Sequence, residues 1–115
     1  MRYIVAGGRD FADYERLHEV CNRLTGVGDV IMSGGARGAD ALGEKYALSQ
    51  PEIVNLETYP ADWDKYKKAA GYIRNHQMSL EADGLIAFWD GKSPGTKNMV
   101  EEAHKARLET HVYYY

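Results

Sequence analysis

Residues 30–40 read VIMSGGARGAD, and this stretch joins two patterns of different period. The apolar run at 30–32 is typical of a short buried strand, and the Ser-Gly-Gly that follows ends it. Apolar residues then recur at helical spacing from Ala39 to Tyr46, and Pro51 closes that segment. A strand that passes through a glycine loop directly into a helix is the repeating unit of a parallel sheet.

The same alternation continues along the rest of the chain. Apolar runs predict further strands at 3–6, 53–59 and 84–89, and 110–115 is either a fifth strand or an aromatic tail. Helical spacing predicts further helices over 14–24, 62–80 and 96–106. We therefore expect an α/β, Rossmann-like three-layer sandwich, with a mostly parallel sheet of about five strands and helices on both faces.

Polar residues mark where these helices can begin. Asp10 or Asp13 can cap the first helix, Asp62 or Asp64 the third and Thr96 the last. Gly71 is a candidate break in the third helical region. We expect the apolar residues of that region to face inward, namely Tyr66, Ala69, Ala70, Ile73 and Leu80.

Length, charge and cysteine content limit the class of protein. The 115 residues indicate one domain spanning 1–115, and the formal net charge of −3 provides no overall basic field for nucleic acid. The single cysteine, Cys21, excludes an internal disulfide, and we interpret it as a packing residue on the apolar stripe of a helix. No segment approaches membrane-spanning length and no signal peptide is recognised, so we expect a cytoplasmic protein without a membrane partner.

The glycine-rich loops follow the first, second and fourth predicted strands. They read GGRD, SGGARGAD and DGKSPGT, and parallel strands bring such loops to one edge of the sheet. Glycine lets backbone N–H groups approach a ligand, and a helix N-terminus adds unpaired donors for an anion. Each loop alone is indistinguishable from an ordinary strand-to-helix turn, but three at one edge favour a phosphate pocket. The loops match neither the P-loop nor the GxGxxG fingerprint, so neither a kinase nor a conventional dehydrogenase is supported.

Charged side chains in and near these loops complete the candidate site. Arg9, Arg37 and Arg74 can pair with phosphate, while three carboxylates, Asp10, Asp40 and Asp90, can accept from ribose hydroxyls or base amines. Trp63 is either a core residue or a stacking platform for a base. The candidate ligand-binding residues are Gly7, Gly8, Arg9, Asp10, Ser33, Gly34, Gly35, Ala36, Arg37, Gly38, Ala39, Asp40, Trp63, Arg74, Asn75, Asp90, Gly91, Ser93, Pro94, Gly95 and Thr96. We expect the backbone amides of 34–39 and 94–97 to hold the phosphate.

Six segments in order resemble a known superfamily: AGGRDF, SGGARGAD, YPADW, AGYIRNHQM, EADGLIAFWDG and SPGTKNMVEEA. Together they resemble the YspA/YpsA-related SLOG domains, which are grouped with the SMF and DprA proteins and with the LOG, or lysine decarboxylase-like, phosphoribohydrolases. The resemblance covers nearly the whole chain. It implies a Rossmann-like fold and a pocket for nucleotides or nucleotide-derived ligands, including ADP-ribose-type signals.

The chain departs from the LOG hydrolases at a position that bears on catalysis. Arg74 to Met78 resembles the Arg-Lys-x-x-Met stretch of those enzymes, with Asn75 in place of the lysine, and Gly95-Thr96 resembles the end of their glycine loop. The glutamate expected three residues further on is Met99. The resemblance therefore implies a retained pocket without its carboxylate. If the chain is an enzyme, Arg74 and Asp90 are the candidate catalytic residues. The histidine spacing indicates no metal site, and we expect no cofactor.

The leading hypothesis is a binding domain for a nucleotide or ADP-ribose-type signal that acts as a sensor or a sponge. The alternative is a LOG-like hydrolase that cleaves the N-glycosidic bond of a nucleoside monophosphate. A DNA-processing role, by analogy with the DprA relatives, is opposed by the acidic charge balance, so we expect no nucleic-acid partner. A plain scaffold, whose loops are only turns, is the fourth interpretation. By analogy with related domains we expect a homodimer or higher homo-oligomer, with the aromatic C-terminus packed on the sheet edge or against a second copy.

Overall fold

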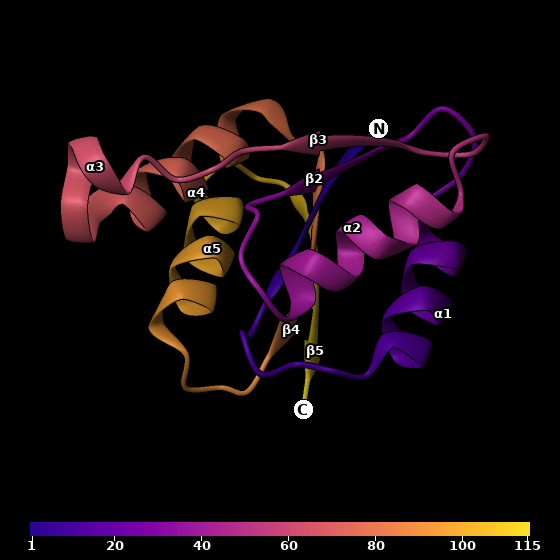
Figure 1. Cartoon of the computed structure of the whole chain (residues 1–115), viewed down its shortest axis with the longest axis horizontal. Helices are drawn as coiled ribbons and strands as arrows, with labels where there is room; N and C mark the ends of the chain where they lie inside the picture. Colours follow the sequence, from indigo (N-terminus) through magenta and orange to yellow (C-terminus); the bar gives the residue numbers. More distant parts are fainter.

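The computed structural model describes residues 1–115, and strands alternate with helices along the chain (Figure 1). The strands are β1 (Arg2–Gly7), β2 (Val30–Ser33), β3 (Asn55–Thr58), β4 (Gly84–Trp89) and β5 (Glu109–Tyr114). The helical elements are α1 (Tyr14–Leu24), α2 (Ala39–Ser49), α3 (Trp63–Tyr66), the 3-10 turn η1 (Lys67–Ala69), α4 (Ala70–Glu81) and α5 (Pro94–Lys105).

The strands form one parallel sheet in the order β3-β2-β1-β4-β5. In the centre of the sheet, Ile4 of β1 is in register with Met32 of β2 and Leu85 of β4. This arrangement confirms the predicted Rossmann-like α/β fold. The chain builds outward from β1 in one direction and then returns to build in the other, so the strand order reverses between β1 and β4. Ligands of open parallel sheets bind outside the carboxyl ends of the strands at such a reversal.

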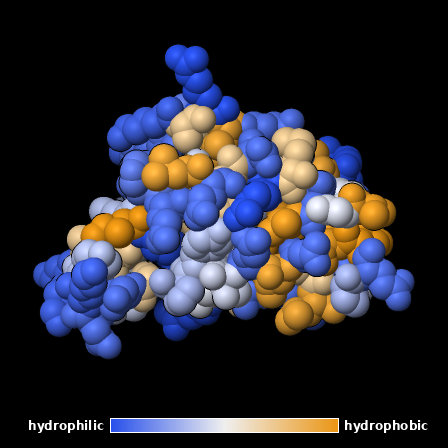
Figure 2. All heavy atoms as spheres, turned by 90° about the horizontal axis from the view of Figure 1, so that it is seen from above, coloured by the Kyte–Doolittle hydropathy of each residue, from blue (hydrophilic) through white to orange (hydrophobic).

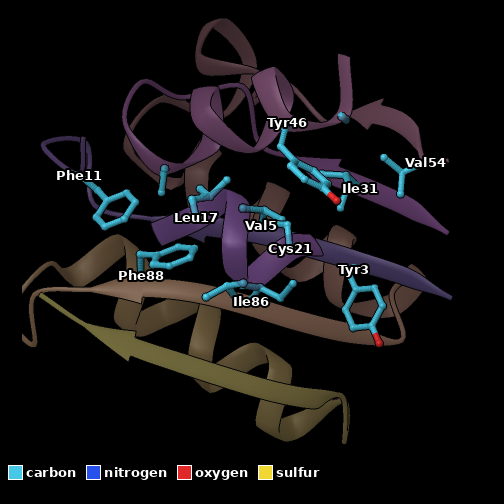
Figure 3. Close-up of a cluster of buried hydrophobic side chains, with 13 residues drawn as sticks. Tyr3, Val5, Phe11, Leu17, Cys21, Ile31, Tyr46, Val54, Ile86 and Phe88 are labelled. Carbon is cyan, nitrogen blue, oxygen red and sulfur yellow. The ribbon is translucent and has the colours of Figure 1, made fainter. Parts of the chain in front are cut away.

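The two faces of the sheet carry separate hydrophobic cores. Alternate residues of β1 point to opposite faces, so Val5 packs under α1 and α2 while Ile4 packs under α4 and α5. Figure 3 shows the first core, in which Leu17 and Cys21 of α1 and Tyr46 of α2 surround Val5. Burial on both faces explains why the central strands are continuous apolar runs rather than alternating ones.

The aromatic C-terminus forms β5 and is part of the fold. β5 pairs with β4 from Glu109 to Tyr114. Tyr113 stacks on Phe88 with ring centroids 5.6 Å apart, and Tyr115 meets Phe11 edge-on at 5.0 Å. The strand interpretation of 110–115 is therefore correct, and the homo-oligomer stays a prediction.

The helical region at 62–80 differs from the expectation. Its break lies at Lys67, whose φ is 55°, and not at Gly71. Residues before and after this turn belong to separate helical segments. Apolar residues on its two sides therefore do not lie on one helix face. Of the residues expected to face inward only Ala70 is buried, while Tyr66, Ala69, Ile73 and Leu80 are exposed. Met78 of α4 is buried as well.

The predicted helix caps are partly right. Asp13 accepts a hydrogen bond from the Arg16 amide at 3.1 Å, and Asp62 accepts one from the Lys65 amide at 3.1 Å. Thr96 does not cap α5: that helix begins one turn earlier, with Ser93 as N-cap and Pro94 in its first turn, where a missing N–H costs nothing.

Cys21 is a packing residue, as predicted. Its side chain is fully buried, and burial raises the pKa of its thiol to about 12. A thiol with so high a pKa is protonated at neutral pH and is a poor nucleophile. None of the helices is both long and apolar enough to cross a bilayer.

Candidate functional site

Two adjoining hollows lie at the carboxyl edge of the sheet. The first, which we name the switch-point hollow, has a volume of about 420 Å³ and lies at the carboxyl ends of β1 and β4, beside α4 and the start of α5. The second, the arginine hollow, has a volume of about 580 Å³ and lies between the loop after β2, the loop after β3 and Arg74. Arg9 and Ala36 line both, so the two hollows adjoin at these residues.

The start of α5 provides open donors in the wall of the switch-point hollow. Oδ1 of Asp90 accepts hydrogen bonds from the amides of Lys92 at 2.8 Å and Ser93 at 2.7 Å, and these bonds hold the pKa of Asp90 below its usual value. The first amide that donates within α5 is that of Lys97, to the Ser93 carbonyl at 3.1 Å. The amides of Gly95 and Thr96 precede that bond, and first-turn amides have no partner within their own helix.

The loop after β2 is arranged differently from the expected phosphate cradle. The Gly35 amide donates to Oγ of Ser33 at 3.1 Å, and the Ala36 amide donates to Oδ2 of Asp40 at 3.2 Å. The Ala39 amide, at the start of α2, donates to the Gly8 carbonyl at 3.1 Å. Several of the amides that were expected to hold an anion are therefore already satisfied by the protein, so the loop contributes side chains and shape.

Asp40 is a buried carboxyl group in the wall of the switch-point hollow. Its side chain is 6% exposed, and burial raises its pKa to about 6. The Ala36 amide and the cations Arg74 and Arg9 favour the ionised form but do not fully offset the burial, to which Glu44 adds repulsion. A carboxyl group with this pKa can change its charge near neutral pH when a ligand enters.

Asp40→Asn is expected to become more stable relative to the wild type as the pH rises. A carboxyl with a raised pKa stabilises the fold while protonated, and this contribution is lost as the pH rises through about 6. The wild type should lose about 2 kcal/mol relative to the asparagine variant between pH 4 and pH 7.5, because the pKa is shifted by about two units and the unfolded carboxyl is already partly ionised at pH 4. Urea unfolding of both proteins at the two pH values measures this difference. A constant difference would show that Asp40 does not titrate in this range.

Arg74 connects the loops that form the arginine hollow. Its Nη1 donates to the carbonyl of Gly34 and, at 3.4 Å, to that of Tyr59, and its Nε donates to Oδ1 of Asn75 at 3.0 Å. Burial lowers the pKa of Arg74, Asp40 raises it and Arg9 lowers it, yet a guanidinium remains charged in proteins. A Cβ at Gly34 would lie 2.5 Å from Nη1 of Arg74 and 2.8 Å from Oδ2 of Asp40, so these two groups approach closely over a residue without a side chain.

Trp63 is exposed and is not a core residue. Its side chain is 51% exposed and lines the arginine hollow. The Cβ position of Gly71 lies 3.5 Å from Cη2 of Trp63 and 3.9 Å from Nη2 of Arg74, so the indole and the guanidinium both lie near this glycine. The core interpretation of Trp63 is therefore wrong, and its role as a platform for a base stays a prediction.

The structure brings most of the expected site residues to the two hollows. Those that line neither are Gly8, Ser33, Gly38, Ala39 and Gly91. Gly8 and Gly38 instead allow the loops after β1 and before α2 to touch, and Ser33 donates to Oε2 of Glu44 at 2.6 Å. Asp10 lines the switch-point hollow but accepts a hydrogen bond from the hydroxyl of Tyr115 at 2.5 Å.

Sequence reasoning missed the apolar floor of the switch-point hollow and one wall of the arginine hollow. The missed residues are Ala6, Pro60, Ala61, Met78 and Met99. Pro60 and Ala61 follow β3, so applying the strand-end rule to every strand would have found them. The buried Met78 and Met99 carry no such signal, because an apolar residue in a helix is ordinarily assigned to the core.

A solved structure of DNA processing protein A from Helicobacter pylori, described for its single-stranded DNA binding mode, shares this fold. The TM-score is 0.69 at 22% sequence identity, over 97% of this chain and 64% of that one. This chain thus spans less than two thirds of the length of that protein.

This likeness overturns the expectation that nucleic acid is not a partner of this chain. The net charge of −3 averages over the whole surface, whereas Arg9, Arg37 and Arg74 gather at one edge of the sheet. A whole-chain balance was the wrong criterion, since the same fold serves a protein that binds single-stranded DNA.

Two further comparisons identify the family. The profile described as the YspA, cpYpsA-related SLOG family matches residues 1–66. The Gene 61 protein of Mycobacterium phage D29 is 34% identical, over 93% of this chain and 91% of the phage protein. The profile match covers more than half of the chain and the phage relative nearly all of it. The chain belongs to the YspA, cpYpsA-related SLOG family.

Proposed function

We propose that the chain binds a nucleotide or a nucleotide-derived ligand in the switch-point hollow. The observation that carries the proposal is the position of the first-turn amides of Gly95 and Thr96 in the wall of a hollow that Arg9 also lines. Amides at a helix N-terminus and a guanidinium are both donors to phosphate.

The remaining walls suit the rest of a nucleotide. Asp40 lies where it can accept hydrogen bonds from ribose hydroxyls, and Met78 and Met99 offer apolar surface to the sugar or base. The hollow is of a size that small-molecule sites commonly have. Binding of an ADP-ribose-type signal would let the chain act as a sensor or as a sponge.

Binding is favoured over hydrolysis of the N-glycosidic bond by the engagement of two of the three carboxyl groups in this wall and by Met99. Asp10 is bonded to Tyr115, and Oδ1 of Asp90 accepts two backbone amides, so neither is arranged to assist bond cleavage. Met99 is buried in the wall where the LOG hydrolases carry glutamate. Release of free base from a nucleoside monophosphate, followed by chromatography, would contradict this assignment.

Arg9→Ala is expected to weaken nucleotide binding about tenfold, because a charge-assisted hydrogen bond is worth about 1.5–3 kcal/mol. Isothermal titration with AMP, ADP, ADP-ribose, cyclic dinucleotides and inorganic phosphate measures the effect. Arg23→Ala is the matched control, since it removes the same charge from an exposed position on α1 and should leave affinity unchanged. If no compound in the panel binds at millimolar concentration, the proposal is wrong.

A second candidate ligand is a nucleotide unit of a single-stranded DNA. The likeness to DNA processing protein A favours it, because that protein binds single-stranded DNA with the same fold. A terminal or backbone phosphate presents the same anionic oxygens as a free nucleotide, so the α5 amides and Arg9 suit both. Titration of a short oligothymidylate in the same experiment separates the two ligands by their affinities.

A further inference from the structure

The segment formed by α3 and η1 projects from one end of the molecule, at the far left of Figure 1. Its aromatic side chains are not packed into either core: Trp63 is 51% exposed, Tyr66 is 38% exposed and Tyr72, in the first turn of α4, is 49% exposed. We call this projection, with its side chains Trp63, Lys65, Tyr66, Lys67, Lys68 and Tyr72, the α3 ridge. Three large aromatic side chains that gather on one projection form the kind of patch that marks a contact with a partner.

The α3 ridge is also rich in positive charge. It holds three of the seven lysines of the chain within four residues, Lys65 to Lys68, and all three are exposed. Nζ of Lys65 lies 5.0 Å from the centre of the Tyr66 ring. Two carboxylates lie in the same segment, Asp62, which caps α3 by accepting the Lys65 amide, and Asp64, so residues 62–68 carry a net formal charge of +1. In Figure 2 the same end of the molecule is mostly blue, because hydrophilic residues predominate there.

The ridge continues directly into the arginine hollow. Trp63 belongs to both, and its indole and Arg74 both lie near Gly71. Arg37 and Arg9 follow on the wall of that hollow, and Arg9 leads on to the switch-point hollow. One path therefore runs from the aromatic side chains and lysines of the α3 ridge, past the arginines of the arginine hollow, to the start of α5.

We propose that this path binds a single-stranded polynucleotide, with a base stacked on Trp63 and backbone phosphates held by the lysines of the α3 ridge. Stacking on aromatic rings combined with a cationic track is the common mode of sequence-tolerant single-strand binding. A duplex would not offer its base faces to Trp63. The inference rests on the proposed function, which supplies the phosphate site at α5 as the anchor at the other end of the path.

Fluorescence anisotropy of a labelled twelve-nucleotide oligothymidylate tests the inference. The variant Lys65→Gln/Lys67→Asn/Lys68→Gln should bind at least about tenfold more weakly, and the slope of log affinity against log salt should fall by about 2, from three phosphate contacts at about 0.7 each. Asparagine is chosen at position 67 because it tolerates the positive φ found there. The control variant Arg23→Gln/Lys45→Gln/Lys105→Gln removes the same charge from α1, α2 and the far end of α5, and should change affinity less than twofold.

The contribution of stacking is tested separately from charge. Trp63→Ala should weaken oligothymidylate binding about tenfold, and Trp63→Phe should restore most of it, because a smaller aromatic face still stacks. Circular dichroism of each variant confirms that the fold is retained.

Titration of AMP into the same variants distinguishes failure of this inference from failure of the proposed function. The lysine variant should bind AMP as the wild type does. If AMP binds but the oligonucleotide binds no more tightly than AMP, the ridge inference is wrong and the proposed function stands. If neither AMP nor phosphate binds while the oligonucleotide binds with the expected ridge dependence, the proposed function is wrong at α5. The inference is also wrong if the wild type binds anionic phospholipid vesicles but not the oligonucleotide, and the lysine variant loses vesicle binding. That result would assign the ridge to a membrane surface.

Discussion

Gly38→Ala is expected to lower the free energy of unfolding by about 3 kcal/mol or more, although it adds only one methyl group. Gly38 precedes α2 with a φ of 77°, which L side chains rarely adopt. Its Cβ would also overlap the carbonyl oxygen of Gly8 and lie 2.6 Å from Cα of Arg9. The loops after β1 and β2 would have to separate, and with them the wall that Arg9 forms.

Gly35→Ala is the matched control for this prediction. Gly35 has the same φ of 77°, but a Cβ there meets no atom within 4 Å. It should therefore cost only the backbone strain of a positive φ, about 1–2 kcal/mol. Urea denaturation of the two variants separates strain from close approach. Equal losses would mean that the contact between Gly38 and the loop after β1 relaxes without cost.

Gly95→Asp is expected to weaken nucleotide or phosphate binding about a hundredfold, which corresponds to about 2.8 kcal/mol, while leaving the fold at least as stable. The new carboxylate would lie in the first turn of α5, beside the amides proposed to hold phosphate. An acidic residue in the first turn of a helix stabilises it by about 0.3–1 kcal/mol. The same charge repels a phosphate and takes its place at the helix N-terminus.

Gly95→Ala completes this experiment as a neutral comparison. A Cβ at Gly95 meets no atom within 4 Å, so alanine adds neither a clash nor a charge. Thermal unfolding and isothermal titration of both variants give stability and affinity together. If aspartate reduces binding no more than alanine does, the phosphate lies elsewhere and the site at α5 must be abandoned.

Sequence patterns predicted those features that follow from the geometry of strands and helices themselves. Buried strands on both faces give continuous apolar runs, and the run at 84–89 matches β4 to the residue. The glycine loops predicted the edge at which the hollows lie, because strand ends meet at one edge in any parallel sheet. Asp13 and Asp62 were each one of two candidate caps, because an aspartate at the start of a helix can accept from a first-turn amide.

The remaining features depend on contacts between segments that are distant in sequence. The Ala36 amide donates to the side chain of Asp40, which turns back onto the loop. The spacing of residues in the sequence does not predict this hydrogen bond. The break at Lys67 was assigned to Gly71 because glycine is the ordinary breaker, whereas here Gly71 accommodates the indole of Trp63. The charge balance pointed away from nucleic acid because a sum over the chain does not show where the charges lie.

The exposed residues that line the hollows lie outside the two hydrophobic cores, so they can be changed without disturbing the cores. Both cores are closed by the sheet and its helices, while Arg9, Arg37 and Trp63 stand on exposed loops and on a short helix. Substitutions at these positions remove no buried apolar contact, so a library that randomises them should retain folded members at high frequency. New ligand preferences can thus be selected at the carboxyl edge of this small sheet, because the two hydrophobic cores that stabilise the fold are left unchanged.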